Sequence, residues 1–487
     1  MSVAIRVGIV VGYLLLALGV GLVAYRLTER SAEDYYLASR TLGTVVLLFT
    51  TFATLLSAFT FFGGPNLTNR AGPEWILTMG LMDGIIFGIL WYVVGYKQWL
   101  IGQAGGYVTL GELLGDRFGS LRIRGLVAAI SLFWLFPYVM LQQMGAGAAL
   151  AALTDGALPY WAGALLVTVF MIVYVVLSGM RGVAWTDTLQ GLFMLGMIWL
   201  AVAWVLAALG GPAAATAQLE GVAPGFLHLG GGLYSPQFVI SKAVGIAFGV
   251  AMFPQVNQRF FVGRSETVLK RSFALWPVLV ILLFVPAFML GAWARGVGIH
   301  AAEGDVLSQL LTAYTPGWFA ALVVAGALAA MMSSSDSMLL SGASYFTRDL
   351  YRPFVAPDAS DRREDVLGRI GVAGFALATF GASLLRPGTL VAIGETAFGG
   401  FAQLTLPVIL ALYWRGTTRQ GMLAGLGGSQ AAYLGSVFLP MIPQTVGGWD
   451  FTLVGMALGL GLTVVGSLVS ERDGESPERY FEEVSRE

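Results

Sequence analysis

The residues best suited to chemistry lie between positions 325 and 351, in the segment AGALAAMMSSSDSMLLSGASYFTRDLY. Asp336 stands there within an otherwise apolar run. Small and hydroxylated side chains recur at steps of three and four, which places them on one side of a helix. In hydrocarbon an unsatisfied hydroxyl costs on the order of a few kcal/mol, so this side must face protein or a water-filled cavity. The stripe consists of Ala330, Ser333, Ser334, Ser337, Ser341 and Ser344.

Two interpretations of this stripe stay open. Small residues and serines let helices approach closely and hydrogen-bond, which is a purely structural role. Hydroxyl and carboxylate oxygens are also the ligands that a hard cation such as Na⁺ prefers, and carboxylates inside a membrane are usually functional. Three serines followed directly by Asp336 favour a cation site, with Ser333 and Ser334 as its first ligands.

The composition places this helix in a membrane protein. Hydrophobic residues make up 57% of the 487 residues and charged residues 11%, and the mean hydropathy is +0.76. We predict an all-α polytopic membrane protein with about 13 transmembrane helices. Cysteine is absent, which excludes disulfides and thiolate metal sites. The predicted spans lie near residues 4–25, 43–66, 74–96, 124–151, 156–179, 183–208, 236–260, 272–295, 316–346, 366–385, 388–414, 418–440 and 450–470.

The distribution of basic residues predicts the orientation. With the N-terminus outside, 22 of the 27 Lys and Arg residues, Arg259 and Arg264 among them, fall in cytoplasmic segments. The positive-inside rule therefore predicts an outside N-terminus and a cytoplasmic C-terminus, which an odd number of spans requires. The exceptions are Arg6, Arg70, Arg295, Arg386 and Lys242.

Two of the spans carry helix breakers. In span 43–66 a regular helix is expected to end near Ser57, ahead of Gly63, Gly64 and Pro65. This is either a simple helix end or a discontinuous helix whose freed carbonyls, such as those of Ala53 and Leu56, bind an ion. Span 236–260 is interrupted in the same way, by Gly245, Gly249 and Pro254.

Each interrupted span opens a set of five, and an odd number of spans would invert the second copy. We therefore predict one transmembrane domain over 1–471, with repeat 1 at about 43–208 and repeat 2 at about 236–414. A short cytoplasmic tail, 472–487, follows.

Other acids stand inside predicted spans. Asp83 lies in span 74–96, and Asp187 lies at the start of span 183–208. An acid in the first turn of a helix complements the helix dipole, which accounts for Asp187 without a ligand. The alternative is a second cation ligand that reaches toward Asp336.

Together these motifs resemble the sodium:solute symporter family, which contains bacterial proline, sugar, sialic acid and pantothenate transporters. The resemblance covers all the predicted spans and is most specific in AAMMSSSDSMLLSGASYFTRDLY at 329–351. AEDYYLASRTLG at 32–43, FATLLSAFTF at 52–61 and AWTDTLQ at 184–190 support it. It implies two inverted five-helix repeats, as in the leucine transporter, with one extra helix before them and two after.

The resemblance also implies which residues bind ions. The main Na⁺ site would combine the carbonyls of Ala53 and Leu56 with Ala330 and the hydroxyls of Ser333 and Ser334. Members with a second Na⁺ site often have a hydroxyl where this chain has a carboxylate, so that acid could carry a proton instead. The positions that match this second site are Asp187, Asp336 and Ser337.

Solute in this family lies between the broken spans and the fourth and eleventh spans. Proline transporters of the family tend to have an acid at the position of Leu55, and its absence argues against proline. SAFTFFGGP is more similar to the pantothenate or monocarboxylate transporters. The residues that the resemblance places near solute are Ser57, Thr60, Phe61, Gln142, Phe253, Pro254, Gln255 and Asn257.

We therefore expect a plasma-membrane transporter, not an enzyme, that couples Na⁺ entry to uptake of a small organic solute by alternating access. The solute is expected to bear a carboxylate, as a monocarboxylate, pantothenate or an amino acid does, and its other surroundings are the lipid bilayer. H⁺ coupling stays open as an alternative. We expect no nucleic acid and no obligatory protein partner.

Two rival functions are disfavoured. A transporter-like membrane sensor would need an output domain, and the expected tail of about 20 residues is too short for one. An intramembrane enzyme would need a catalytic cluster. The only histidines, His228 and His300, fall in predicted external loops, and no Ser-His or metal-binding motif accompanies them.

Overall fold

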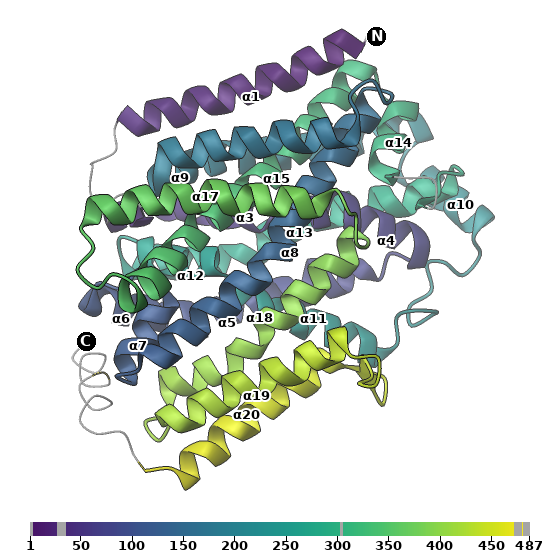
Figure 1. Cartoon of the computed structure of the whole chain (residues 1–487). Helices are drawn as coiled ribbons and strands as arrows, with labels where there is room; N and C mark the ends of the chain where they lie inside the picture. Colours follow the sequence, from purple (N-terminus) through teal and green to yellow (C-terminus); the bar gives the residue numbers. More distant parts are fainter. Residues whose placement is uncertain (1–2, 27–35, 302–304, 472–479, 481–487) are drawn as a thin grey trace.

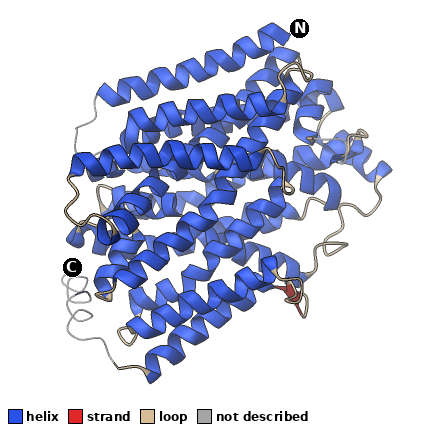
Figure 2. Cartoon of the chain, viewed as in Figure 1, coloured by secondary structure: helices blue, strands red, loops and turns tan. Residues whose placement is uncertain are grey.

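The computed structural model describes residues 3–26, 36–301, 305–471 and 480, and almost all of them are helical (Figure 2). Within these residues the only strands are β1 (Thr445–Val446) and β2 (Trp449–Asp450), which pair antiparallel. The predicted all-α class is therefore confirmed. The predicted tail, 472–487, lies outside the described residues except for Tyr480.

Within the described residues, ten helices are long and apolar enough to cross a membrane, or up to twelve if each of two bent helix pairs is one span. The twelfth predicted span, 418–440, forms α19 (Arg419–Phe438), which is not among these helices because Gly, Ser and Gln residues lower its hydropathy. The other spans contain α1 (Val3–Arg26); η3 (Ile76–Asp83), α5 (Gly84–Leu90), η4 (Trp91–Tyr96) and α6 (Lys97–Gly105); α8 (Leu121–Leu153); α9 (Tyr160–Leu209); α13 (Glu266–Gly296); α15 (Gly317–Ser344), η6 (Tyr345–Tyr351) and α16 (Arg352–Phe354); α17 (Asp361–Ser383); α18 (Leu390–Tyr413); and α20 (Phe451–Val469).

The two bent pairs are the two spans for which the sequence predicts breaks. The first pair consists of α3 (Thr44–Leu55) followed by η2 (Phe59–Gly63) and α4 (Gly64–Ala71), with a bend of 60°. The second consists of α11 (Pro236–Ala251) and α12 (Pro254–Val262), bent by 57°. Pro254 cannot donate a backbone hydrogen bond, so α11 cannot continue through it. Both spans are discontinuous helices, and neither is a simple helix end.

Helix α9 contains two spans without a loop between them. Its backbone leaves the helical region at Gly179, where φ is 58° and ψ is −167°. A side chain at this φ would be strained, so glycine allows the chain to reverse in one residue. The halves, Tyr160–Leu177 and Gly179–Leu209, are each long and apolar enough to cross a membrane.

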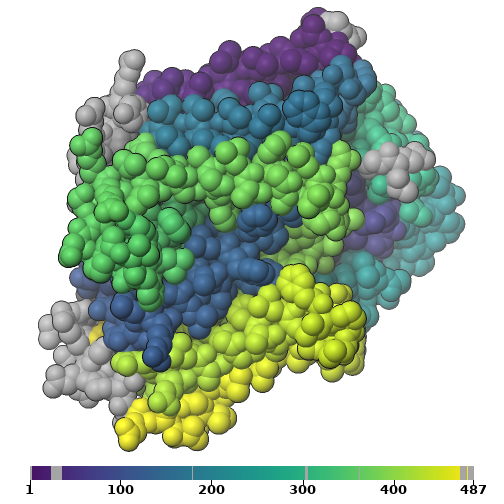
Figure 3. Space-filling model, viewed as in Figure 1, coloured from purple at the N-terminus to yellow at the C-terminus, as the bar shows by residue number. Residues whose placement is uncertain are grey.

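The serine-bearing helix α15 lies at the centre of the bundle. In the most apolar part of the span that contains α15, 83% of the residues are buried, whereas in that of α1 only 17% are buried. It packs against α3, α8, α9 and α17. Helix α1 lies along one edge of the molecule, whereas α19 and α20 form the opposite edge against α18 (Figures 1 and 3).

The two ends of the bundle differ in charge. At one end, here called the basic end, lie α6, α7 (Leu110–Arg117), η6 and α16, and η1 (Ala38–Arg40) packs beside α12 near them (Figure 1). At the other, the far end, lie α4, α10 (Pro212–Val222), α14 (Val306–Tyr314) and the β1–β2 hairpin (Figure 1). The described chain begins at the far end, and α20 runs toward the basic end. The basic end carries Arg117, Arg124, Arg348, Arg352 and Arg419.

Candidate functional site

The break after α3 frees backbone groups in the middle of the bundle. Helix α3 ends at Leu55, and Leu56 is extended, with φ −80° and ψ 130°. The chain resumes as a helix at Phe59, so the N–H of Ala58 has no partner within a regular helix. The Oε1 of Gln142 on α8 accepts from this N–H at 2.9 Å. A side chain predicted to lie near solute therefore holds the break in shape.

Two hydroxyls of α15 point at the carbonyls of this break. The Oγ of Ser333 donates to the carbonyl of Ala53 at 2.7 Å, and the Oγ of Ser334 donates to that of Leu56 at 2.5 Å. Ser333 Oγ also lies 3.0 Å from the carbonyl oxygen of Ala330. All five residues are at most 1% exposed. The residues predicted for the main cation site thus meet at one point between α3 and α15.

This cluster presents only neutral oxygen atoms. Among the residues that the structure describes, no group of three or more His, Cys, Asp or Glu could hold a metal ion. Carbonyl and hydroxyl oxygens suit a hard cation, and without a carboxylate they suit a single charge better than a double one. Each hydroxyl lies close enough to its carbonyl for both oxygens to contact one ion once the proton turns away.

Two of the three residues predicted for a second site, Asp187 and Ser337, contact an arginine. Arg259 on α12 is fully buried, and its guanidinium donates to Asp187 Oδ2 at 2.9 Å and to Ser337 Oγ at 2.5 Å. It also donates to the hydroxyl of Thr50 at 3.0 Å, and Thr50 in turn donates to Asp187 at 2.6 Å. A covalently attached positive charge therefore occupies the space between Asp187 and Ser337. Asp336 is 1% exposed, and its Oδ1 has no hydrogen-bond partner among the described residues.

Arg259 is buried within the bundle, although its place at the end of a predicted span counts it among the basic residues expected in cytoplasmic segments. It lies on α12, the second helix of a bent pair, and its contacts connect α3, α9, α12 and α15. A buried ion pair is costly to break from one side, because the remaining charge has no water to solvate it.

The residues predicted to lie near solute are found either at a small cavity or at the two helix breaks. Thr60 lines a small closed cavity, and Phe253 packs against Tyr138 and Phe398 beside that cavity, with ring centroids 4.9 Å and 5.5 Å apart. Gln142 and Asn257 instead bond backbone at the two breaks; Asn257 donates to the carbonyl of Phe253 at 2.9 Å. The hydroxyl of Ser57 lies 3.2 Å from that of Tyr138. The others, Phe61, Pro254 and Gln255, are buried at these same breaks.

The closed cavity lies between the first bent pair, η3, α8, α11, α13 and α18. Its volume is about 30 Å³, enough for one or two water molecules. An aromatic layer formed by Phe59, Tyr138, Phe253 and Phe398 packs at one side of it. A solute larger than water therefore requires these helices to separate.

Toward the far end, a lysine links α11 to the helices at its side. Lys242 Nζ lies 3.1 Å from Glu395 Oε2 on α18 and 2.8 Å from Asp450 Oδ2 in the β1–β2 hairpin. These side chains are 16%, 21% and 23% exposed. We call these three residues the far-end ion cluster.

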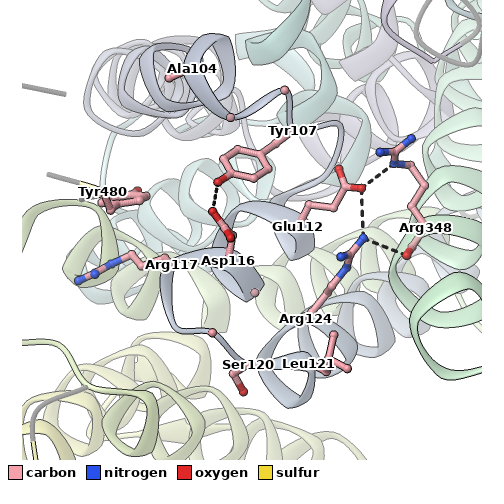
Figure 4. A pocket seen from close by; sticks show the side chains of 14 residues that line it. Ala104, Tyr107, Glu112, Asp116, Arg117, Ser120, Leu121, Arg124, Arg348 and Tyr480 are labelled. Carbon is pink, nitrogen blue, oxygen red and sulfur yellow. Dashed lines mark hydrogen bonds and ion pairs between the residues drawn. The ribbon is translucent and has the colours of Figure 1, made fainter. Parts of the chain in front are cut away.

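The largest cavity described, about 910 Å³, opens at the basic end (Figure 4). On one wall Glu112 of α7 accepts from Arg348 at 2.6 Å and from Arg124 at 3.1 Å, and Tyr107 donates to Asp116 (Figure 4). These bonds join α7 and α8 to η6. None of the predicted site residues lines this cavity.

Three residues near the site were not among the predicted site residues: Arg259, Asp83 and Tyr138. Asp83 lines the closed cavity, and the signal for it was an acid inside an apolar run, which by itself indicates function. Arg259 stands at the end of a predicted span, where a basic residue normally marks the membrane surface. No sequence signal distinguishes Tyr138 from other aromatic residues in its span.

The comparisons with known proteins agree with this geometry. The model of the sodium:solute symporter family matches residues 35–428. The sodium/pantothenate symporter of Escherichia coli (strain K12) is 28% identical, over 95% of this chain and 98% of that protein. The high-affinity proline transporter PutP of Bacillus subtilis (strain 168) is 27% identical, over 84% of this chain and 87% of that protein.

Among solved structures, a Na⁺-coupled sialic acid symporter in a substrate-bound outward-open state is similar in fold. The TM-score is 0.78 at 19% identity, over 96% of this chain and 98% of that chain. The fold is therefore of the leucine-transporter type, with two inverted five-helix repeats, one helix before them and two after. With a family match that covers most of its length, the chain is a member of the sodium:solute symporter family.

Proposed function

We propose that this protein is a secondary active transporter that couples the entry of Na⁺ to the uptake of a small organic solute. The observation that carries the proposal is the contact of Ser333 and Ser334 with the carbonyls of Ala53 and Leu56. An ion held by these oxygens would fix the broken span against α15. Family membership supports Na⁺ as that ion, and the names of the relatives support a small organic solute.

The proposed coupling uses one Na⁺ per solute, because Arg259 already supplies a positive charge between Asp187 and Ser337. One charge that crosses 100 mV releases about 2.3 kcal/mol, enough for a roughly 50-fold solute gradient before any Na⁺ gradient is counted. We assign the basic end to the cytoplasm, with an outside N-terminus, from the positive-inside rule. The repeats are assigned to about 43–208 and 236–414.

Alternating access then corresponds to the opening of one end of the bundle at a time. The far-end ion cluster ties α11 to α18 on the outer side of the closed cavity, and the Arg259 contacts tie α3 to α9, α12 and α15 on the inner side. Both sets of bonds are formed here, and the cavity between them, at about 30 Å³, is too small for an organic solute.

Transport in reconstituted vesicles tests the proposal. Vesicles with an inward Na⁺ gradient should accumulate at least one of radiolabelled pantothenate, proline or pyruvate, and vesicles with K⁺ in place of Na⁺ should not. Accumulation that follows a proton gradient and ignores Na⁺ would show H⁺ coupling instead. Accumulation of no compound, together with no stabilisation of the purified protein by Na⁺, would contradict the proposal.

Replacement of the lysine in the far-end ion cluster should open the outer side. In Lys242→Met, the carboxylates of Glu395 and Asp450 lose their shared counter-ion, and α11 loses its ion pair with α18. Two partly exposed ion pairs contribute about 0.4–2 kcal/mol together, so the outward-open population should rise by roughly two- to thirtyfold.

The readout is a single cysteine at Thr60, which lines the closed cavity of a chain that has no native cysteine. A membrane-impermeant thiol reagent added outside should modify Thr60→Cys faster when Lys242→Met is present. Lys270→Met, which removes an exposed pair with Glu266, is the matched control and should leave the rate unchanged. If Thr60→Cys is modified at the same rate with Lys242→Met as with Lys270→Met, the far-end ion cluster takes no part in gating.

A further inference from the structure

The closed cavity contains one ionisable carboxylate and no basic side chain. Asp83 ends the π-helical segment η3 and faces this cavity. It is 7% exposed, and its Oδ1 has no hydrogen-bond partner among the described residues. No Lys, Arg or His is among the residues that line the cavity. If Asp83 is ionised, its counter-ion therefore comes from outside the protein's own lining.

The other walls of the cavity are mainly apolar and aromatic. Rings come from Phe59, Phe87, Trp276 and Phe398, and hydroxyls come from Thr60 and Tyr138. An unpaired carboxylate in such surroundings is unfavourable, because little water or protein dipole solvates it. Ring faces attract cations through their quadrupole, and this attraction grows when water is excluded.

This combination selects the charge of the solute. A cationic nitrogen would gain from both the carboxylate and the rings, and it would relieve the desolvation of Asp83. A solute whose only charge is a carboxylate would meet a like charge and no counter-ion in the lining. The cavity lining therefore disfavours a simple monocarboxylate, even though the protein belongs to a family with such transporters.

We propose that Asp83 binds a positively charged nitrogen of the solute, so that the transported compound is an organic cation or a zwitterion such as an amino acid or a betaine. The proposal rests on the proposed function, since it names the solute class of the same transporter. In this proposal Asp83 of η3, on the span that follows the broken helix, makes the ionic contact. The faces of the aromatic rings contact the rest of the ammonium group.

Two matched pairs of probes isolate the nitrogen charge. β-Alanine and butanoate differ in an ammonium against a methyl group, and glycine betaine and 3,3-dimethylbutanoate differ in a quaternary nitrogen against a quaternary carbon. Binding is measured by thermal stabilisation of the purified full chain in Na⁺. In at least one pair the nitrogen compound should bind about tenfold or more tightly than its carbon analogue, as expected for a charge-assisted contact.

Two variants connect that preference to Asp83. Asp83→Asn should reduce the preference to within about twofold, while Asp83→Glu should retain part of it. Leu55 lines the same cavity, so Leu55→Asp in the background of Asp83→Leu returns a carboxylate to the cavity from another helix. That double variant should regain a preference for the nitrogen compound that Asp83→Leu alone has lost.

The outcomes are distinct from those that test Na⁺ coupling. Na⁺ alone should stabilise the Asp83 variants as it stabilises the wild type, because Asp83 is not among the oxygens of the Ser333–Ser334 cluster. If neither nitrogen compound binds better than its carbon analogue, or if Asp83→Asn keeps the preference, the proposal is wrong while Na⁺ coupling stands. A change confined to the pH dependence of transport in Asp83→Asn would identify Asp83 as a proton carrier and also overturn the proposal.

Discussion

Purified Ser333→Ala/Ser334→Ala protein should no longer be stabilised by Na⁺ relative to K⁺. Among the residues that the structure describes, these two hydroxyls are the only side-chain oxygens that hydrogen-bond the carbonyls of Ala53 and Leu56. A contact between a neutral polar group and a charge contributes about 1.5–3 kcal/mol, so the loss of two should weaken Na⁺ binding by on the order of a hundredfold or more. Thermal denaturation across a Na⁺ titration measures this without knowledge of the solute.

The neighbouring serine provides the matched control. Ser335 is equally buried on the same helix, but its hydroxyl donates to the carbonyl of Met331 within α15 at 2.7 Å. Ser335→Ala should therefore keep the Na⁺ response of the wild type. If the double variant and this control respond to Na⁺ alike, the cation does not bind between α3 and α15, and the proposed mechanism fails.

Arg259→Gln should lose both stability and transport. The substitution removes the counter-ion of the fully buried Asp187, which keeps the hydroxyl of Thr50 as a hydrogen-bond donor. Removal of one member of a buried ion pair costs about 3–5 kcal/mol. The double variant Asp187→Asn/Arg259→Gln removes both charges, so it should recover about 1–3 kcal/mol of that loss. Melting temperatures of the single and double variants measure this coupling.

On the proposed mechanism, the same residue should limit coupling to one Na⁺. With Arg259 in place, Na⁺ activation of transport should be non-cooperative, with a Hill coefficient of about 1. Arg264→Gln, an exposed substitution just past α12, controls for the loss of a positive charge in this region and should leave stability and activation unchanged. Sigmoidal activation in the wild type, or an Arg259→Gln variant as stable as the wild type, would mean that the guanidinium does not substitute for a second cation.

Much of the fold follows from patterns that a sequence displays directly. Long apolar runs identify spans because a bilayer tolerates little else, and the break at Pro254 follows from backbone chemistry. The other break lies at Leu56 and Ser57, whereas Gly63, Gly64 and Pro65, which predicted it, are helical. The spacing of Ser333 and Ser334 along one helix face also follows from helix geometry alone. Their contact with Ala53 and Leu56 was expected from the resemblance, because nothing local indicates which of the other spans α15 meets.

The contacts that depend on a partner far along the chain were harder to foresee. Arg259 resembles a residue at the membrane surface until α12 bends back into the bundle and brings it to Asp187. In the sequence, Lys242 stands out only as an exception to the positive-inside rule, although it faces two acids from other elements. A charge in an apolar run signals that a partner exists, but only the packing of the helices identifies that partner.

The position of Asp450 gives the two last helices a part in the transport cycle. This residue immediately precedes α20, outside the ten-helix core, yet it shares Lys242 with Glu395 of that core. When α11 swings away from α18, the hairpin must either follow or release its lysine. Whatever presses on the outer surface of α20, whether bilayer thickness or a neighbouring protein, would then bias the resting conformation and hence the rate of turnover.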